Sequence, residues 1–435
     1  MKKRIIALFL AAVLACGHSQ VFASEEVAEE EIEITFAWAN GEDKVKEAWS
    51  KYVFEPFMEK HPNVTIKAEW IPNIQHALRV QLTSGEGPDM FYMDSIDIID
   101  LANAGNIISL EEFREEYKLD EYMQDWALRA CSFNDELYGL PHSVEATALT
   151  YNKTLLDQLG VPVPTTREEF VAACEAALDA GIIPISFGYS GETNLMQWVY
   201  EHYLTTYAGD KVVQLLKGEI DFSDPDIRGA FELMKADWDA NYFNDKKSGA
   251  ITLDEARSLF TNQKALFSTE GAWYTLVDTA PGTWEFEWGQ TKWPSMKDGV
   301  EAASGIAVGE SIGINSNCEH PELIVEMMMD FYTNSENAAA AINEGGFSTP
   351  AVPIPNEAYP EEMHEDIRTA LEAQASNMEG TVGYAPWAFY PAKTAIYMYD
   401  NLDKLFYDQI SLDDFMNGCQ ECIEEDFADG YVFAG

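Results

Sequence analysis

Segments with strand-like and helix-like patterns alternate near the start of the chain, and this alternation constrains the fold more than any other feature. Residues 32–39, 64–70 and 90–93 are β-rich, while apolar residues recur at helical spacing over 45–60 and 74–84. Parallel strands need crossover connections, which are usually helices. The β-α-β-α-β order therefore predicts a largely parallel sheet with helices on both faces.

A second group of α/β elements follows the first. The expected strands are 148–151, 182–187 and 304–315, and the expected helices are 153–159, 167–180 and 320–334. Thr166, followed three residues later by Glu169, has the pattern of a capping box. Two strand groups and a return strand predict an α/β fold of two lobes. We expect the chain to cross between the lobes more than once and to form a cleft and a hinge there.

The N-terminus has the pattern of an export signal. Lys2, Lys3 and Arg4 precede an apolar run over 5–15 that is too short to span a bilayer. Two processing routes remain open: cleavage after residue 23, or lipidation at Cys16 with removal of residues 1–15. Either route predicts a cell-surface, extracellular or periplasmic protein. The Glu-rich residues 24–31 would form an acidic tether.

The charge of the chain excludes several classes of partner. It has 75 acidic and 27 basic side chains among 435 residues, a formal net charge of -48. Phosphate backbones and anionic lipids are bound through Lys and Arg, so neither nucleic acid nor direct attachment to an anionic membrane is expected. A hydrophobic content of 47% is sufficient for a large core, so the chain is expected to be folded.

Metal, redox and catalytic motifs are weak. Cys419 and Cys422 form a lone CxxC followed by acidic residues, which is more typical of cysteines in a helical core than of a zinc or redox site. Residues 309–313 fit the G-x-S-x-G pattern, but that motif requires strand, turn and helix, whereas the alternation here continues through residue 315. We expect no catalysis, no cofactor and no metal. A secreted glycoside hydrolase remains the alternative from another class.

Several short motifs, in a fixed order, resemble those of the bacterial extracellular solute-binding proteins of carbohydrate ABC importers. These are GEGPDMFY at 85–92, YGLP at 138–141, VEA at 144–146, YNK at 151–153, PTTREEF at 164–170, FTNQKALF at 260–267 and GAW at 271–273. WANGEDK at 38–44 and the segment 144–153 are similar to the maltodextrin-binding branch. The cluster that this branch carries after its third strand is replaced by MDSI at 93–96, so the sugar stays open.

The resemblance implies a two-lobed protein that closes on its ligand like a flytrap. The N-terminal lobe would comprise 32–140 and 295–345, and the C-terminal lobe 141–294 and 346–435. The implied ligand is a sugar or oligosaccharide, and the implied partner is an ABC permease. The chain is expected to be a monomer. Another polar solute, such as a polyamine, remains an alternative ligand because of the strong negative charge.

Tryptophans are the first candidates for contact with a sugar, because an indole ring can stack on an apolar sugar face. Trp273 follows a glycine after a strand, and Trp387 lies in an aromatic stretch between prolines. Trp198 is a third candidate, although it could equally be a core residue of an amphipathic helix. Trp38 is interpreted as a core residue.

Polar candidates lie at the ends of expected strands. Glu145 interrupts the apolar run 144–149, where a carboxylate needs a partner or an opening. Asp94 ends a strand, although it could equally cap a helix. Asn40, Lys44 and Tyr189 complete the predicted ligand-binding set. For Asn40 and Lys44 the plainer alternative is a turn residue with a solvated charge.

Overall fold

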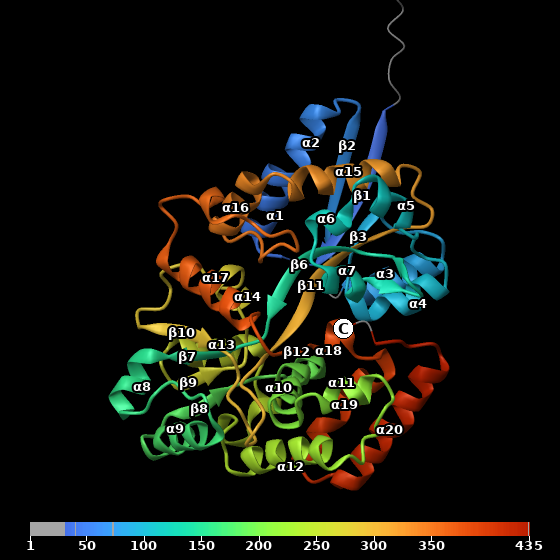
Figure 1. The fold of residues 1–435 in the computed structure, drawn as a ribbon. Coiled ribbons are helices and arrows are strands. Elements are labelled where there is room, and N and C mark those ends of the chain that lie inside the picture. Colours follow the sequence, from blue (N-terminus) through green and yellow to red (C-terminus); the bar gives the residue numbers. More distant parts are fainter. Residues whose placement is uncertain (1–30, 40, 72–73, 434) are drawn as a thin grey trace, which may run out of the picture.

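The computed structural model describes residues 31–39, 41–71, 74–433 and 435 (Figure 1). The predicted signal, Cys16 and Asn40 lie outside these residues, and so does nearly all of the predicted tether. The first sheet has the order β12-β11-β3-β1-β2, and β6 pairs with β11. Its strands are β1 (Ile32–Ala39), β2 (Val64–Ile71), β3 (Met90–Met93), β6 (Leu140–Ala146), β11 (Ser304–Ile314) and β12 (Val382–Tyr384). β1 pairs parallel with β2 and β3, as the alternation predicts.

The helical segment after β1 shows how the sequence pattern becomes packing. It comprises α1 (Asp43–Trp49), a π-helical turn (Ser50–Phe54) and α2 (Glu55–Lys60), in place of one regular helix. Val45, Trp49, Val53 and Phe57, the apolar residues at helical spacing, are all buried in the first core. The periodicity thus predicted the buried face, and the π turn is a local adjustment within it.

The second sheet has the order β10-β7-β9-β8. Its strands are β7 (Leu149–Asn152), β8 (Ile183–Ser186), β9 (Ala265–Ser268) and β10 (Trp288–Thr291). The helix α9 (Arg167–Asp179) begins at Thr166, whose hydroxyl accepts a hydrogen bond from the Glu169 amide at 3.3 Å. The N-cap is therefore confirmed. The Glu169 carboxylate, however, accepts bonds from the amide and hydroxyl of Thr165, one residue before the cap.

The other helices lie around these two sheets. With the first sheet are α3 (Ile74–Thr83), α4 (Ile98–Asn103), α5 (Glu111–Glu116), α6 (Leu119–Tyr122), α7 (Asp125–Ala130), α15 (Pro321–Tyr332) and α16 (Ser335–Asn343). With the second are α8 (Lys153–Leu159), α10 (Gln197–Tyr203), α11 (Lys211–Leu216), α12 (Pro225–Asp239), α13 (Leu253–Thr261), α14 (Trp273–Leu276), α19 (Ala392–Phe406) and α20 (Leu412–Ala428). The short helix α18 (Pro386–Phe389) packs in the first core beside β11. The helix α17 (Glu365–Asn377) lies beside β10, α14 and β6.

The chain crosses repeatedly between two hydrophobic cores, one for each sheet. β6 of the first sheet leads within two residues to β7 of the second, and β10 of the second leads back to β11 of the first. After β12 the chain enters α19 and α20, which pack on the second core. The α/β two-lobed fold class is confirmed.

The positions of these strands and helices bear on two interpretations of the sequence, the G-x-S-x-G pattern at 309–313 and the cysteine pair Cys419 and Cys422. Residues 309–313 lie wholly within the strand β11, so the strand, turn and helix of a nucleophile elbow are not formed there. Cys419 and Cys422 both lie on α20, and Cys419 is buried in the second core. Within the described residues, no helix combines the length and the apolar character needed to cross a membrane.

Candidate functional site

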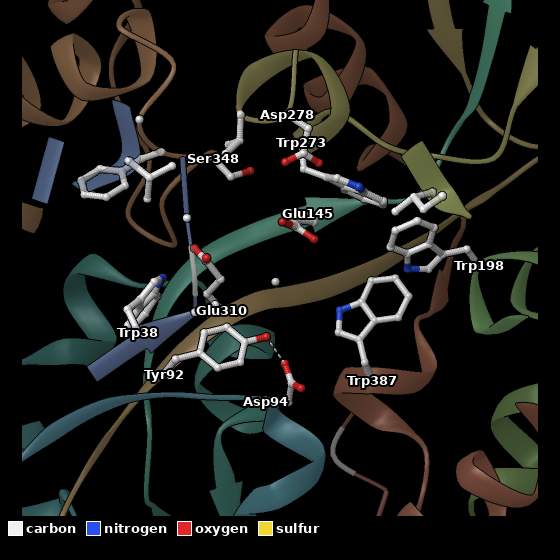
Figure 2. Close-up of a pocket in the computed structure, with 18 of the residues that line it drawn as sticks. Trp38, Tyr92, Asp94, Glu145, Trp198, Trp273, Asp278, Glu310, Ser348 and Trp387 are labelled. Atoms are coloured by element: carbon white, nitrogen blue, oxygen red, sulfur yellow. Dashed lines mark hydrogen bonds between the residues drawn. The ribbon is translucent and has the colours of Figure 1, made fainter. Parts of the chain in front are cut away.

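A cavity of about 480 Å³ lies where the crossing strands β6 and β11 meet the helices of both lobes. Its volume is in the range of small-molecule sites. Side chains from β1, β3, β6 and β11 line it together with residues of α10, α13, α14 and α18. Figure 2 shows Trp198, Trp273 and Trp387 on one side of the cavity, with Asp278 beside Trp273, and Glu145, Glu310 and Trp38 towards the other side.

Trp198, Trp273 and Trp387 form the aromatic side of the cavity. The ring centroids of Trp198 and Trp273 are 5.5 Å apart, and those of Trp273 and Trp387 are 6.4 Å apart with the rings nearly perpendicular. Gly271 permits this arrangement, since a Cβ there would lie 2.2 Å from the Ala146 carbonyl oxygen. The glycine therefore lets the start of α14 approach the crossing strand and present Trp273 to the cavity.

Glu145 and Glu310 project into the cavity from the paired strands β6 and β11. Burial, reinforced by the charge of Glu310, raises the pKa of Glu145 well above its ordinary range. Burial also raises the pKa of Glu310 to about 7, and a hydrogen bond from Trp38 opposes this shift. Gly309 leaves space for the Glu145 carboxylate, because a Cβ at Gly309 would lie 2.2 Å from Glu145 Cδ.

Two further carboxylates lie at the edges of the cavity. Asp94 accepts a hydrogen bond from the Tyr92 hydroxyl, and no side-chain cap bond forms from Asp94 to the helix that follows it. Asp278, just after α14, is paired with Arg257 at 2.6 Å. Arg257 is also paired with Glu270 at 2.5 Å. The one guanidinium among the described lining residues is thus shared by two carboxylates.

Five of the eight predicted site residues line the cavity: Asp94, Glu145, Trp198, Trp273 and Trp387. Lys44 does not line it. Burial lowers the pKa of Lys44, and the charges of Glu42 and Asp278 oppose this shift, so Asp278 is the cavity carboxylate that acts on Lys44. Asn40 lies outside the described residues.

Tyr189, another residue of the predicted set, does not line this cavity. It lies two residues beyond Phe187, past the end of β8, which is the edge strand of the second sheet. Its ring is buried in the second core beside Phe187, and its hydroxyl donates to Asp403 on α19. The described contacts of Tyr189 are thus within the second core and with α19.

Glu310 was not predicted from the sequence, because its position depends on an irregularity in strand pairing. In the register that pairs Ala307 with Glu145, Glu310 would lie opposite His142 and face away from the cavity. A bulge at Gly309 shifts the pairing so that Glu310 lies opposite Ser143, on the same face as Glu145. Tyr92 and Asp278 were also missed. Trp38 is buried, as expected, and its edge additionally lines the cavity.

The fold and the cavity define a class, the two-lobed ligand-binding proteins in which crossing strands form the floor of the site. The family comparison agrees, because the sequence model of the bacterial extracellular solute-binding proteins matches residues 41–339, more than half of the chain. The chain belongs to this family.

Curated relatives match most of the chain. The Multiple sugar-binding protein of Streptococcus mutans serotype c is 23% identical over 332 residues, which cover 73% of this chain and 74% of that protein. The Galactooligosaccharide-binding protein of Bacillus subtilis is 26% identical over 312 residues, 70% of either chain. These relatives are named as binding proteins.

Solved structures share the fold. A chitin oligosaccharide binding protein has a TM-score of 0.79 at 20% identity, covering 92% of this chain and 99% of that one. The GacH receptor of Streptomyces glaucescens, solved unliganded and with acarbose, has a TM-score of 0.71 at 16% identity, covering 92% and 100%.

Proposed function

We propose that the protein captures a carbohydrate in the cavity between its lobes and delivers it to an ABC transporter permease. The observation that carries this proposal is the arrangement of three tryptophans opposite several carboxylates across a single cavity. Supporting it are the family of the chain and the sugar-binding names of its relatives.

The cavity has the two kinds of group that a sugar needs. The apolar C–H faces of a sugar ring can stack on Trp198, Trp273 or Trp387. Its hydroxyls can donate to the carboxylates of Glu145, Glu310 and Asp94, which accept without restriction when ionised. Because these groups come from both lobes, a sugar that contacts all of them favours the closed arrangement and shifts the population towards it.

The division of the lobes and the route of the protein to its site of action belong to this proposal. The proposed lobes comprise 32–140 with 295–345, and 141–294 with 346–435, although β6 and β12, which fall in the second by number, pair within the first sheet. In this proposal β6 and β11 form the hinge region. The chain is exported and acts as a monomer outside the cytoplasm. It is either cleaved after residue 23 or anchored through a lipid at Cys16, and intact-mass spectrometry of the secreted protein separates these routes.

The experiment is a thermal-shift screen of the mature protein against mono- and oligosaccharides and linear polyamines, followed by calorimetry of each hit and chromatography of the ligand afterwards. The proposal predicts saturable binding of at least one sugar, recovered intact. Turnover of a glycoside would show the alternative activity, glycoside hydrolysis. Binding of no sugar at all would contradict the proposal.

A further inference from the structure

Carboxylates outnumber cations around the cavity. Asp94, Glu145, Asp278 and Glu310 line it, whereas Arg257 is the one Lys or Arg side chain among the described lining residues. Arg257 is already paired with Glu270 and Asp278. It therefore has little remaining charge to offer Glu145 or Glu310, and Lys44, whose charge acts on Asp278, does not line the cavity.

Among these carboxylates, Glu145 has the fewest described contacts that could offset a negative charge. Its carboxylate makes no hydrogen bond or ion pair with any residue that the structure describes. The charges that act on it come from Glu310 on β11, Asp278 after α14 and Asp94 after β3, and all of them are negative. A carboxylate removed from water without a partner is costly, and like charges nearby increase that cost.

This arrangement is built into the strands. The bulge at Gly309 turns Glu310 onto the face of Glu145, and the missing side chain of Gly309 makes room for the Glu145 carboxylate. A regular strand pairing would instead separate the two carboxylates onto opposite faces of the sheet. Two neighbouring backbone features thus bring like charges together at the cavity floor, where a bound cation would relieve their repulsion.

The opposite wall suits a cation as well. Trp198, Trp273 and Trp387 lie across the cavity from Glu145 and Glu310 (Figure 2). Indole faces attract ammonium groups through their negative quadrupole, most strongly where water is excluded. The same faces also stack on sugar rings. An aromatic wall opposite two neighbouring carboxylates, of which Glu145 has no described hydrogen-bond partner, therefore suits a ring that carries a positive charge.

We propose that the ligand carries a primary ammonium group, which binds between Glu145 and Glu310 while its ring stacks on the tryptophans, so that the natural ligand is an amino sugar. This inference rests on the proposed carbohydrate function. A linear polyamine offers the same ammonium chemistry without the ring. The three tryptophans favour the amino sugar over the polyamine as the molecule that carries the ammonium group, because they can stack on its ring. The experiment below distinguishes the two ligands.

The test is calorimetry of the mature protein with matched sugars, each as the hydroxyl, amine and N-acetylated form. The glucose, galactose and mannose series are used as mono- and disaccharides, with spermidine as the linear amine. We expect at least one amine to bind about tenfold or more tighter than both of its matched forms, since a charge-assisted bond replaces a neutral one. In Glu145→Gln this ratio falls towards one.

Glu219→Gln is the matched control, because it removes an exposed carboxylate that does not line the cavity. It should keep the preference for the amine, and thermal melts verify that both variants are folded. Equal affinities for the three forms, or a preference that survives Glu145→Gln, would overturn the inference and leave the carbohydrate function standing. Binding of spermidine but no sugar supports the ammonium site and overturns the carbohydrate function. If the protein binds neither a sugar nor spermidine, both the inference and the carbohydrate function are overturned.

Discussion

Glu201 on α10 is a fully buried carboxylate at the crossing between the lobes. The hydroxyl of Thr147, just after β6, donates to it at 3.1 Å, and the hydroxyl of Thr205 donates at 3.0 Å. Burial outweighs these two bonds and raises its pKa from 4.5 to about 7. The adjacent His202 adds no compensating charge, because burial lowers its pKa to about 3.

This shift gives a pH dependence of stability with a definite sign. The unfolded chain loses the Glu201 proton near pH 4.5, whereas the folded chain keeps it up to about pH 7. The contribution of Glu201 is therefore complete below the lower value and is lost as the pH rises through the higher one.

We expect Glu201→Gln to remove this contribution. Between about pH 5 and pH 8, the free energy of unfolding should fall by up to about 3 kcal/mol more in the wild-type protein than in the variant. Urea denaturation at both pH values measures the difference. Parallel pH profiles for the two proteins would show that Glu201 ionises normally.

Trp198 is the most exposed of the three cavity tryptophans, so its truncation separates binding from stability best. Trp198→Ala should weaken sugar binding by about tenfold to a hundredfold, because a stacking platform is lost. Trp126→Ala is the control, since Trp126 is also half-buried but does not line the cavity. Equal loss of affinity in both variants, measured by calorimetry, would mean that the platform has been misplaced.

Three of the predicted residues that line the cavity share a local signal in the sequence. Trp273 follows a glycine, Trp387 lies between prolines, and Glu145 interrupts an apolar run, so each departs from the pattern of its own segment. Regular alternation along β11 would place the Glu310 side chain on the face that points away from the cavity. The bulge shifts the register, so that the side chain lies on the face of Glu145. A bulge depends on pairing between distant strands, so the local sequence does not predict it.

At the scale of the element, the bulge can be tested at Gly309. A methyl group there would meet the Glu145 carboxylate at 2.2 Å from its Cδ, so either the strand or the carboxylate must move. Gly309→Ala should lower the free energy of unfolding by about 1–3 kcal/mol and weaken ligand binding as well.

A double-mutant cycle identifies the cause. If the clash with Glu145 is responsible, adding Gly309→Ala to Glu145→Ala should cost much less stability than Gly309→Ala alone. Urea denaturation of the four proteins gives the coupling. If the losses in unfolding free energy are additive, Gly309 stabilises the protein through its own backbone conformation and not by making room for the Glu145 carboxylate.

At the scale of the whole molecule, strand and helix order predicted two α/β lobes and repeated crossings. That prediction succeeded because each segment follows its own periodicity, and right-handed crossover rules leave few arrangements for such an order. Which side chains meet across the cavity depends on the relative placement of the lobes. Periodicity holds no information about that placement, which is why Tyr92 and Asp278 were not predicted.

Closure is the expected response of the molecule to its ligand. Residues of both proposed lobes line the cavity, Asp94 and Glu310 from one and the three tryptophans from the other, so a bound sugar should favour the arrangement that brings them together. We expect the radius of gyration from small-angle X-ray scattering to decrease when the mature protein is saturated with sugar. An unchanged radius would indicate a rigid site that does not close.

The central claim is that a sugar occupies the cavity between the tryptophans and the carboxylates. A crystal structure of the protein with the tightest-binding sugar from the screen tests it most directly. The account predicts a sugar ring stacked on at least one of Trp198, Trp273 and Trp387, with a donor group within hydrogen-bond distance of Glu145. A sugar bound elsewhere on the protein, with this cavity filled only by water, would contradict the account.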